Sequence, residues 1–193
     1  MTIQEFFPEA AQEVVGVVKR ARSDDLSVPT PCTDFDLKTL VNHFVGTTAA
    51  LTRVGLRTPL DADDPYGSGQ DPSKGDWPTQ LSSNVEGLAR AWSDPQAWEG
   101  AVDMGGMEMP ATMVGEMAMA EILLHGWDLA RATGQQLTIP DDAALELRRS
   151  IEETAELGRK MGAYGDEVRV AHDATEFDRA LGASGRDPSW SVA

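Results

Sequence analysis

The chain has 193 residues, of which 41% are hydrophobic and 25% are charged, a composition typical of a globular protein and unlike that of a disordered chain. Its 32 acidic and 16 basic residues give a formal net charge of −16, which argues against nucleic acid and anionic membrane surfaces as partners because both repel negative charge. The length favours a single domain over residues 1–193.

The sequence shows no targeting or membrane segment. Its first residues, Met-Thr-Ile-Gln-Glu-Phe-Phe-Pro, place an acid early and lack the basic region that precedes the apolar stretch of a signal peptide. The longest weakly polar stretch, residues 111–130, carries four ionisable side chains and makes a poor membrane span. The single cysteine, Cys32, excludes an internal disulfide and fits a reducing compartment. We therefore expect a cytoplasmic protein.

The N-terminal half predicts two helices separated by a rigid loop. Apolar residues at helical spacing indicate a helix from Ile3 to about Arg22, which the following Ser-Asp-Asp ends. Residues 28–36 contain two prolines, which disfavour helix. Asp36 then caps a second helix from Leu37 to about Arg57. Residues 58–75, rich in Pro, Gly, Asp and Ser, form a long loop.

Helices dominate the remainder as well, so we predict a mainly α bundle in which amphipathic helices bury their apolar faces against one another. Residues 98–109 contain Gly105-Gly106 and allow a small β-hairpin. The predicted helices are Trp77 to Trp92, then Pro110 to about Thr133 with Gly134 as its cap, then Asp141 or Asp142 to about Met161, and a short one near Thr175 to Leu181.

The helix after Pro110 is apolar nearly all the way round, yet Glu121, His125 and Asp128 share one of its faces, within about 60° of one another. A carboxylate in such surroundings costs several kcal/mol unless a cation or hydrogen bonds compensate it. Glu-x-x-x-His therefore predicts two metal ligands one turn apart. The alternative is an ordinary surface pair, because many helices carry Glu and His four residues apart.

His43 is one of only three histidines and lies about 120° round from the centre of the apolar stripe of its helix. From there it faces a neighbouring helix. His43, Glu121 and His125 together form a three-ligand set that leaves zinc an open position for water or substrate. The alternative for His43 is a histidine at the edge of the helix, hydrogen-bonded to a loop carbonyl.

Asp128, on the same helix face as Glu121 and His125, has two possible roles. Asp128 either orients His125 or pairs with an arginine, and we favour a structural role. The candidate partners are Arg131 and Arg20.

A small buried hydrophobe is favoured for Cys32 over a thiol near the site. Trp127 is expected in the core, and His172 and Glu116 are expected at the surface.

Residues 28–46 read VPTPCTDFDLKTLVNHFVG, and residues 120–135 read AEILLHGWDLARATGQ. These two long motifs resemble the DinB-like superfamily, in its actinobacterial branch related to the N-terminal domain of mycothiol-dependent maleylpyruvate isomerase. The tail FDRALGASGRDP, residues 177–188, extends the similarity over nearly the whole chain. The resemblance implies an up-down-down-up four-helix bundle with an additional short helix. It also implies a metal bound by His, Glu and His, which map onto His43, Glu121 and His125.

The resemblance further implies that a low-molecular-weight thiol such as mycothiol approaches the metal. The isomerase has a second, C-terminal domain that contributes to its active site, and this sequence ends before such a domain could fit. The resemblance therefore predicts the metal ligands of this chain but does not predict the reaction that it would catalyse.

We hypothesise a thiol-dependent transferase or isomerase that acts on a small electrophile and holds a divalent metal, zinc first and nickel as the alternative. The competing hypothesis is a non-catalytic metal-binding or accessory protein that uses the same site. Both hypotheses are compatible with a homodimer.

Overall fold

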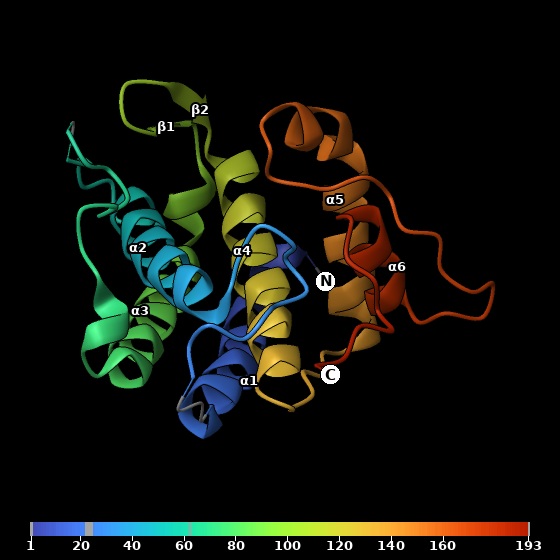
Figure 1. The fold of residues 1–193 in the computed structure, drawn as a ribbon. Helices are drawn as coiled ribbons and strands as arrows, with labels where there is room; N and C mark the ends of the chain where they lie inside the picture. The colour runs from blue at the N-terminus through green and yellow to red at the C-terminus, as the bar shows by residue number, and fades with distance from the viewer. Residues whose placement is uncertain (1, 22–24, 62, 193) are drawn as a thin grey trace.

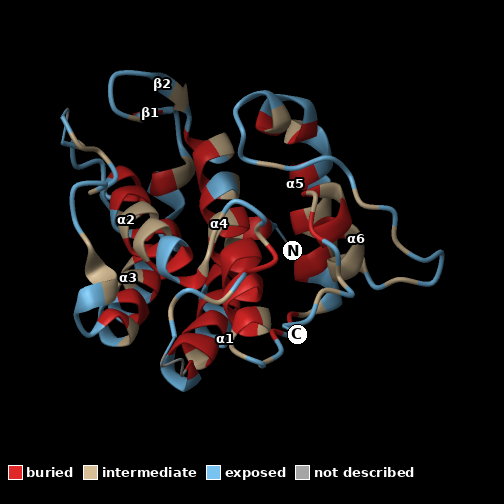
Figure 2. Ribbon diagram, in the orientation of Figure 1, coloured by how far each residue is buried: buried red, intermediate tan, exposed pale blue. Residues whose placement is uncertain are grey.

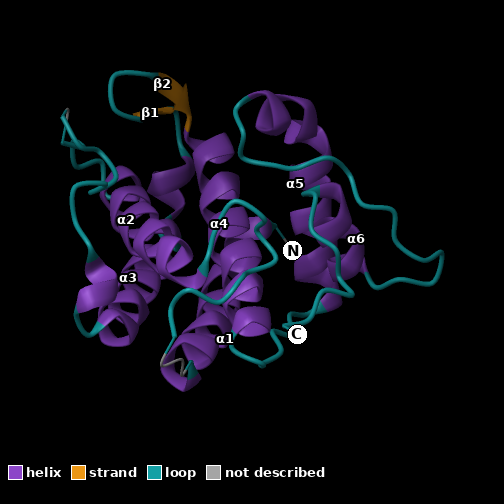
Figure 3. Cartoon of the chain, viewed as in Figure 1, coloured by secondary structure: helices purple, strands orange, loops and turns teal. Residues whose placement is uncertain are grey.

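The computed structural model describes residues 2–21, 25–61 and 63–192, and it is mainly helical, as predicted (Figures 1 and 3). The described residues form the α-helices α1 (Phe7–Arg20), α2 (Leu37–Gly55), α3 (Trp77–Trp92), α4 (Ala111–Ala132), α5 (Asp141–Lys160) and α6 (Glu176–Ala183). They also form the short 3-10 helices η1 (Ile3–Phe6), η2 (Pro72–Lys74) and η3 (Pro95–Trp98) and the strands β1 (Ala101–Asp103) and β2 (Glu108–Pro110).

Most element boundaries agree with the sequence-based predictions. Asp36 caps α2 as expected, because its carboxylate accepts a hydrogen bond from the Thr39 N–H. The small hairpin is present, with β1 antiparallel to β2 and Val102 opposite Met109. Pro110 precedes α4 instead of lying in its first turn, since it pairs with Ala101 as the last residue of β2. The predicted end of the first helix, at Arg22, lies outside the described residues.

Helices α2 and α3 are parallel neighbours. In the middle of both helices, Asn84 Nδ2 donates a hydrogen bond to the Val45 carbonyl, 3.0 Å away. Near their ends, the buried Trp92 indole donates to the Leu51 carbonyl, also at 3.0 Å. Gly55 permits this close approach, because a Cβ at this position would lie 2.9 Å from the Trp92 indole nitrogen.

Helices α1 and α4 are also parallel to each other. Val14 packs against Gly126, where an added Cβ would lie only 2.8 Å from a Val14 methyl group. Just beyond the end of α4, Gln135 donates to the Val17 carbonyl near the end of α1.

The two parallel pairs run in opposite directions. Arg57, just after α2, donates to the carbonyls of Gln96, Ala97, Glu99 and Ala101. This segment lies beside the start of α4, because the Ala111 N–H donates to the Gly100 carbonyl. Lys19 near the end of α1 pairs with Glu86 in the middle of α3, whereas Pro8 near the start of α1 lies with Ser93 beyond the end of α3. The order is therefore up-down-down-up, as the resemblance implied.

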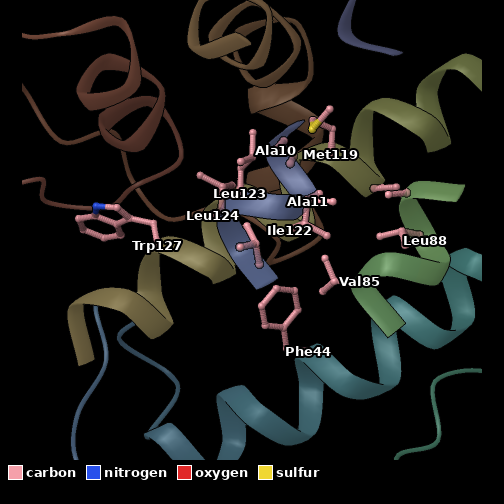
Figure 4. Packing of buried hydrophobic residues seen from close by; sticks show 14 of the residues in the cluster. Ala10, Ala11, Phe44, Val85, Leu88, Met119, Ile122, Leu123, Leu124 and Trp127 are labelled. Atoms are coloured by element: carbon pink, nitrogen blue, oxygen red, sulfur yellow. The ribbon is translucent and has the colours of Figure 1, made fainter. Parts of the chain in front are cut away.

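Helix α4 is the central helix, because 16 of its 22 residues are buried (Figure 2). Figure 4 shows Ile122 of α4 with Phe44 of α2, Val85 of α3 and Ala11 of α1 at the centre of the bundle. Helices α5 and α6 lie side by side next to α4 (Figure 1). Trp127 is in the core, as predicted. No helix in the described residues is both long and apolar enough to cross a membrane.

Candidate metal centre

The structure brings the three predicted ligands together, because α2 and α4 pack against each other with His43 and Glu121 facing. His43 Nε2 lies 2.9 Å from Glu121 Oε1, and His125 Nε2 lies 3.6 Å from the same oxygen. One ligand atom from each residue lies within 4.8 Å of those of the other two. An i, i+4 pair on one helix and one residue on its neighbour thus face a common point, as the spacing predicted.

These residues fit a divalent cation. Glu121 Oε1 is buried and, among the described residues, has no hydrogen-bond partner, since the short contact to His43 lacks hydrogen-bond geometry. A buried carboxylate oxygen without a partner is costly, and a cation compensates it directly. Two imidazole nitrogens and one carboxylate oxygen are a donor set that zinc accepts. The orphaned oxygen therefore lies where a metal would satisfy it.

The charges of the site are interdependent. Burial alone would lower the pKa of His43, but the Glu121 carboxylate outweighs burial and the pKa is raised above its ordinary value. Burial would raise the pKa of Glu121, but the adjacent His125 and His43 outweigh burial and lower it. The proximity of Glu121 and His43 therefore favours the charged form of each of these two groups.

Asp128 contacts the nitrogen of the His125 ring that faces away from Glu121. His125 Nδ1 lies 2.9 Å from Asp128 Oδ2, and Asp128 forms a two-point ion pair with Arg186 in the C-terminal tail. The prediction that Asp128 pairs with Arg131 or Arg20 was wrong, because both arginines donate elsewhere. The tail returns to α4 across 58 residues of sequence, and no local spacing indicates such a contact.

A pocket of about 280 Å³ opens in front of the three candidate ligands. Besides His43, Glu121 and His125, it is lined by residues 31–35, 162–165 and 184–186. These loops lie before α2, after α5 and after α6.

Cys32 is half-buried and lines this pocket, so its prediction as a buried hydrophobe was wrong and the alternative of a thiol near the site holds. Burial raises the pKa of the Cys32 thiol, and Asp128 adds to the shift, which keeps the thiol protonated at neutral pH.

The aromatic wall of the pocket was not predicted. Phe35 lies 5.1 Å from His43 and 6.0 Å from His125, measured between ring centres. Tyr164 lines the pocket from the loop after α5. Phe35 lies within the first resembling motif, which was its only signal in the sequence.

Two surface predictions have different outcomes. His172 is exposed, as predicted. Glu116 is half-buried, and that prediction was wrong, because Ser150 of α5 donates a hydrogen bond to its carboxylate.

Comparison with known proteins gives one family and two related chains. The family model described as "Mycothiol maleylpyruvate isomerase N-terminal domain" matches residues 7–130. "Uncharacterized protein MT0763" and "Uncharacterized protein Rv0738", from two strains of Mycobacterium tuberculosis, are each 23% identical over 138 residues, which cover 71% of this chain and 70% of the relative. No solved structure gives a significant match.

Proposed function

Because the chain belongs to the family of the mycothiol maleylpyruvate isomerase N-terminal domain, we propose that it binds a divalent metal and uses a low-molecular-weight thiol, such as mycothiol, on a small electrophile. The metal ligands in this proposal are His43, Glu121 and His125. Zinc is the first choice and nickel the second. The reaction is a thiol transfer or a thiol-dependent isomerisation.

The observation that carries the proposal is the buried, unpartnered Glu121 Oε1 beside two imidazole nitrogens at the base of a pocket. A divalent cation held by His43, Glu121 and His125 would supply Lewis acidity there and would lower the pKa of a thiol or water bound to it. The chain's own residues hold the ligand atoms in place. Phe35 and Tyr164 contribute apolar walls that partly exclude water from the pocket.

The size of the pocket separates this proposal from the non-catalytic alternative. A purely structural metal site is closed by four protein ligands, whereas a reactive site keeps a position open. The group of ligand residues has three members in the described part of the chain, and about 280 Å³ of space lies in front of it. Both features favour access by a small molecule.

Location and partners belong to the same proposal. We propose a cytoplasmic protein without nucleic-acid partners, in line with a net charge of −16 and one free cysteine. The expected partners are the small thiol and the electrophile.

Cobalt substitution followed by thiol titration tests the proposal. Cobalt-loaded protein should gain a sulfur-to-metal absorption band when mycothiol is added, because coordination favours the thiolate. His43→Ala and His125→Ala should lose both metal and band. The matched control is His172→Ala, which removes an exposed histidine and should behave as wild type.

Cys32 requires its own control because its thiol lines the same pocket. A sulfur band that is present before thiol is added and absent in Cys32→Ser would identify Cys32 as a fourth ligand and support the closed, non-catalytic site. A band that appears only with added thiol and persists in Cys32→Ser supports the proposal. Metal binding without any thiol-dependent band contradicts the thiol chemistry and leaves the non-catalytic function.

A further inference from the structure

A buried chain of three charged or polar groups connects the C-terminal tail to the candidate metal centre. Arg186 Nε lies 2.9 Å from Asp128 Oδ1, and Arg186 Nη2 lies 2.8 Å from Asp128 Oδ2. The same Oδ2 lies 2.9 Å from His125 Nδ1. The side chains of Arg186 and Asp128 are 6% and 0% exposed. Solvent therefore does not compete for these bonds.

This geometry determines which nitrogen of His125 carries a proton. A carboxylate can only accept a hydrogen bond, so His125 must donate from Nδ1 to Asp128. Nε2 then lies on the side of Glu121, 3.6 Å from Oε1. A histidine that binds metal through one nitrogen commonly donates its other N–H to a carboxylate, which fixes the ring orientation.

Arg186 fixes that carboxylate in turn. A guanidinium makes two parallel bonds to a carboxylate and thereby sets its plane as well as its charge. Arg186 Nη1 also donates to Ser184 Oγ at 3.2 Å, which orients the guanidinium relative to its own turn. A lysine could supply the charge but not this two-point geometry.

A tight turn after α6 delivers Arg186 to α4. Gly185 has a φ of +89°, a left-handed conformation that favours glycine. Arg186 N–H donates to the Leu181 carbonyl and closes the turn. Gly165, in the loop after α5, packs on Gly185 so closely that a Cβ there would lie 2.6 Å from the Gly165 Cα. The close packing of the loops that contain Gly165 and Gly185 thus fixes the position of the buried Arg186.

We infer that Arg186 is a positioning residue for the metal centre: it holds Asp128, which keeps His125 Nδ1 protonated and turns Nε2 toward the metal. The inference rests on the proposed metal site. It assigns the C-terminal tail a part in metal affinity, although Arg186 is no ligand. The competing explanation is that the ion pair only fastens the tail to the bundle.

An apolar replacement of the pair separates these explanations. Removing one charge alone leaves the other buried and uncompensated, which unfolds many proteins. Asp128→Leu combined with Arg186→Met removes both charges, and such replacements are often neutral or stabilising. The control is Arg148→Met combined with Glu176→Leu, which removes an ion pair of 2.7 Å between α5 and α6 away from the pocket.

Two measurements compare the variants with wild type: the position of the proton on His125 and the binding of cobalt. Nitrogen-15 NMR of the three imidazoles in metal-free protein shows whether His125 Nδ1 carries a proton. Titration with cobalt gives the metal dissociation constant and the d–d spectrum. We expect the Asp128→Leu/Arg186→Met variant to move the His125 proton to Nε2, to weaken cobalt binding about 10- to 100-fold and to alter the spectrum. The cobalt affinity of Arg186→Lys should lie between that of this double variant and that of wild type.

The outcomes are distinct. A folded Asp128→Leu/Arg186→Met variant with wild-type cobalt affinity, spectrum and proton position would overturn the positioning role and leave the metal site intact. A wild-type protein with Nδ1 protonated but no cobalt binding would overturn the proposed function, while the orientation of His125 by Asp128 would stand. The Arg148→Met/Glu176→Leu control should match wild type in both measurements.

Discussion

The pocket has two walls of different construction. The helical wall consists of His43, Glu121 and His125 on α2 and α4, and the loop wall consists of residues 31–35, 162–165 and 184–186. In the helical wall, side-chain positions follow from the 3.6-residue repeat and from the packing of two long helices. In the loop wall, positions depend on contacts between segments far apart in sequence, such as Gly165 against Gly185.

The walls also differ in how their charges are satisfied. In the helical wall, Glu121 Oε1 is buried without a hydrogen-bond partner among the described residues. In the loop wall, Arg186 forms two hydrogen bonds with the buried Asp128 of α4, so the two charges satisfy each other. An unsatisfied group is available to bind a cation, whereas a satisfied buried pair holds structure in place. The ligand atoms for a metal therefore come from the helical wall, whereas the Arg186–Asp128 pair should contribute most to fold stability and should affect metal affinity only through its contact with His125.

The largest expected effect comes from Asp128→Ala. It leaves the Arg186 charge buried with no carboxylate, and breaking one partner of a buried pair costs roughly 3–5 kcal/mol. His43→Ala in the helical wall should cost about 1 kcal/mol, because the side chain is 35% exposed. Urea unfolding of the metal-free proteins measures both. If Asp128→Ala and His43→Ala lowered the free energy of unfolding equally, the Arg186–Asp128 pair would contribute no more to stability than the helical wall does.

A smaller loss is expected from Gly185→Ala in the loop wall. A non-glycine residue held in a left-handed conformation costs about 1–3 kcal/mol, and here the added Cβ also meets Gly165. Gly134→Ala is the matched control, since Gly134 has a φ of +68° but a Cβ added there would meet nothing within 4 Å. Thermal and urea unfolding should show Gly185→Ala to be the more destabilised. A larger loss in Gly134→Ala would show that the contact with Gly165 contributes nothing.

The contrast between the walls also explains what the sequence could predict. The helices and the placement of Glu121 and His125 on one helix face follow from apolar periodicity and an i, i+4 spacing, which are local signals. The sequence left an alternative open for His43, and its assignment to the same site was supported by the resemblance. The bundle order and the fold family came from the resemblance. Arg186 was missed as the partner of Asp128 because the two residues are 58 positions apart in the sequence and the contact depends on the turn at Gly185. Cys32 was misplaced for the same reason, because its environment depends on the tail that returns across α4.

The smallest expected effect concerns pH and tests the helical wall alone. The pKa of His43 is raised from its ordinary value of 6.5, since the Glu121 carboxylate outweighs the opposing effect of burial. A group whose pKa is higher in the folded state binds its proton more tightly there, so it stabilises the fold fully below the unfolded value. That contribution is lost as pH rises through the raised folded value. Solvent screening keeps it small, because His43 is about one-third exposed.

His43→Gln isolates this contribution because glutamine does not titrate. In metal-free protein, the difference in unfolding free energy between wild type and His43→Gln should shrink from about pH 5.5 to about pH 8.5. Metal occupancy should change in the opposite direction, because ligating histidines must be neutral and protons compete with the metal at low pH. Urea unfolding and zinc dialysis at the same pH values measure the two trends. A stability difference that grew with pH would contradict the raised pKa of His43 in the folded protein, whereas zinc occupancy that did not change with pH would argue against the histidines as ligands.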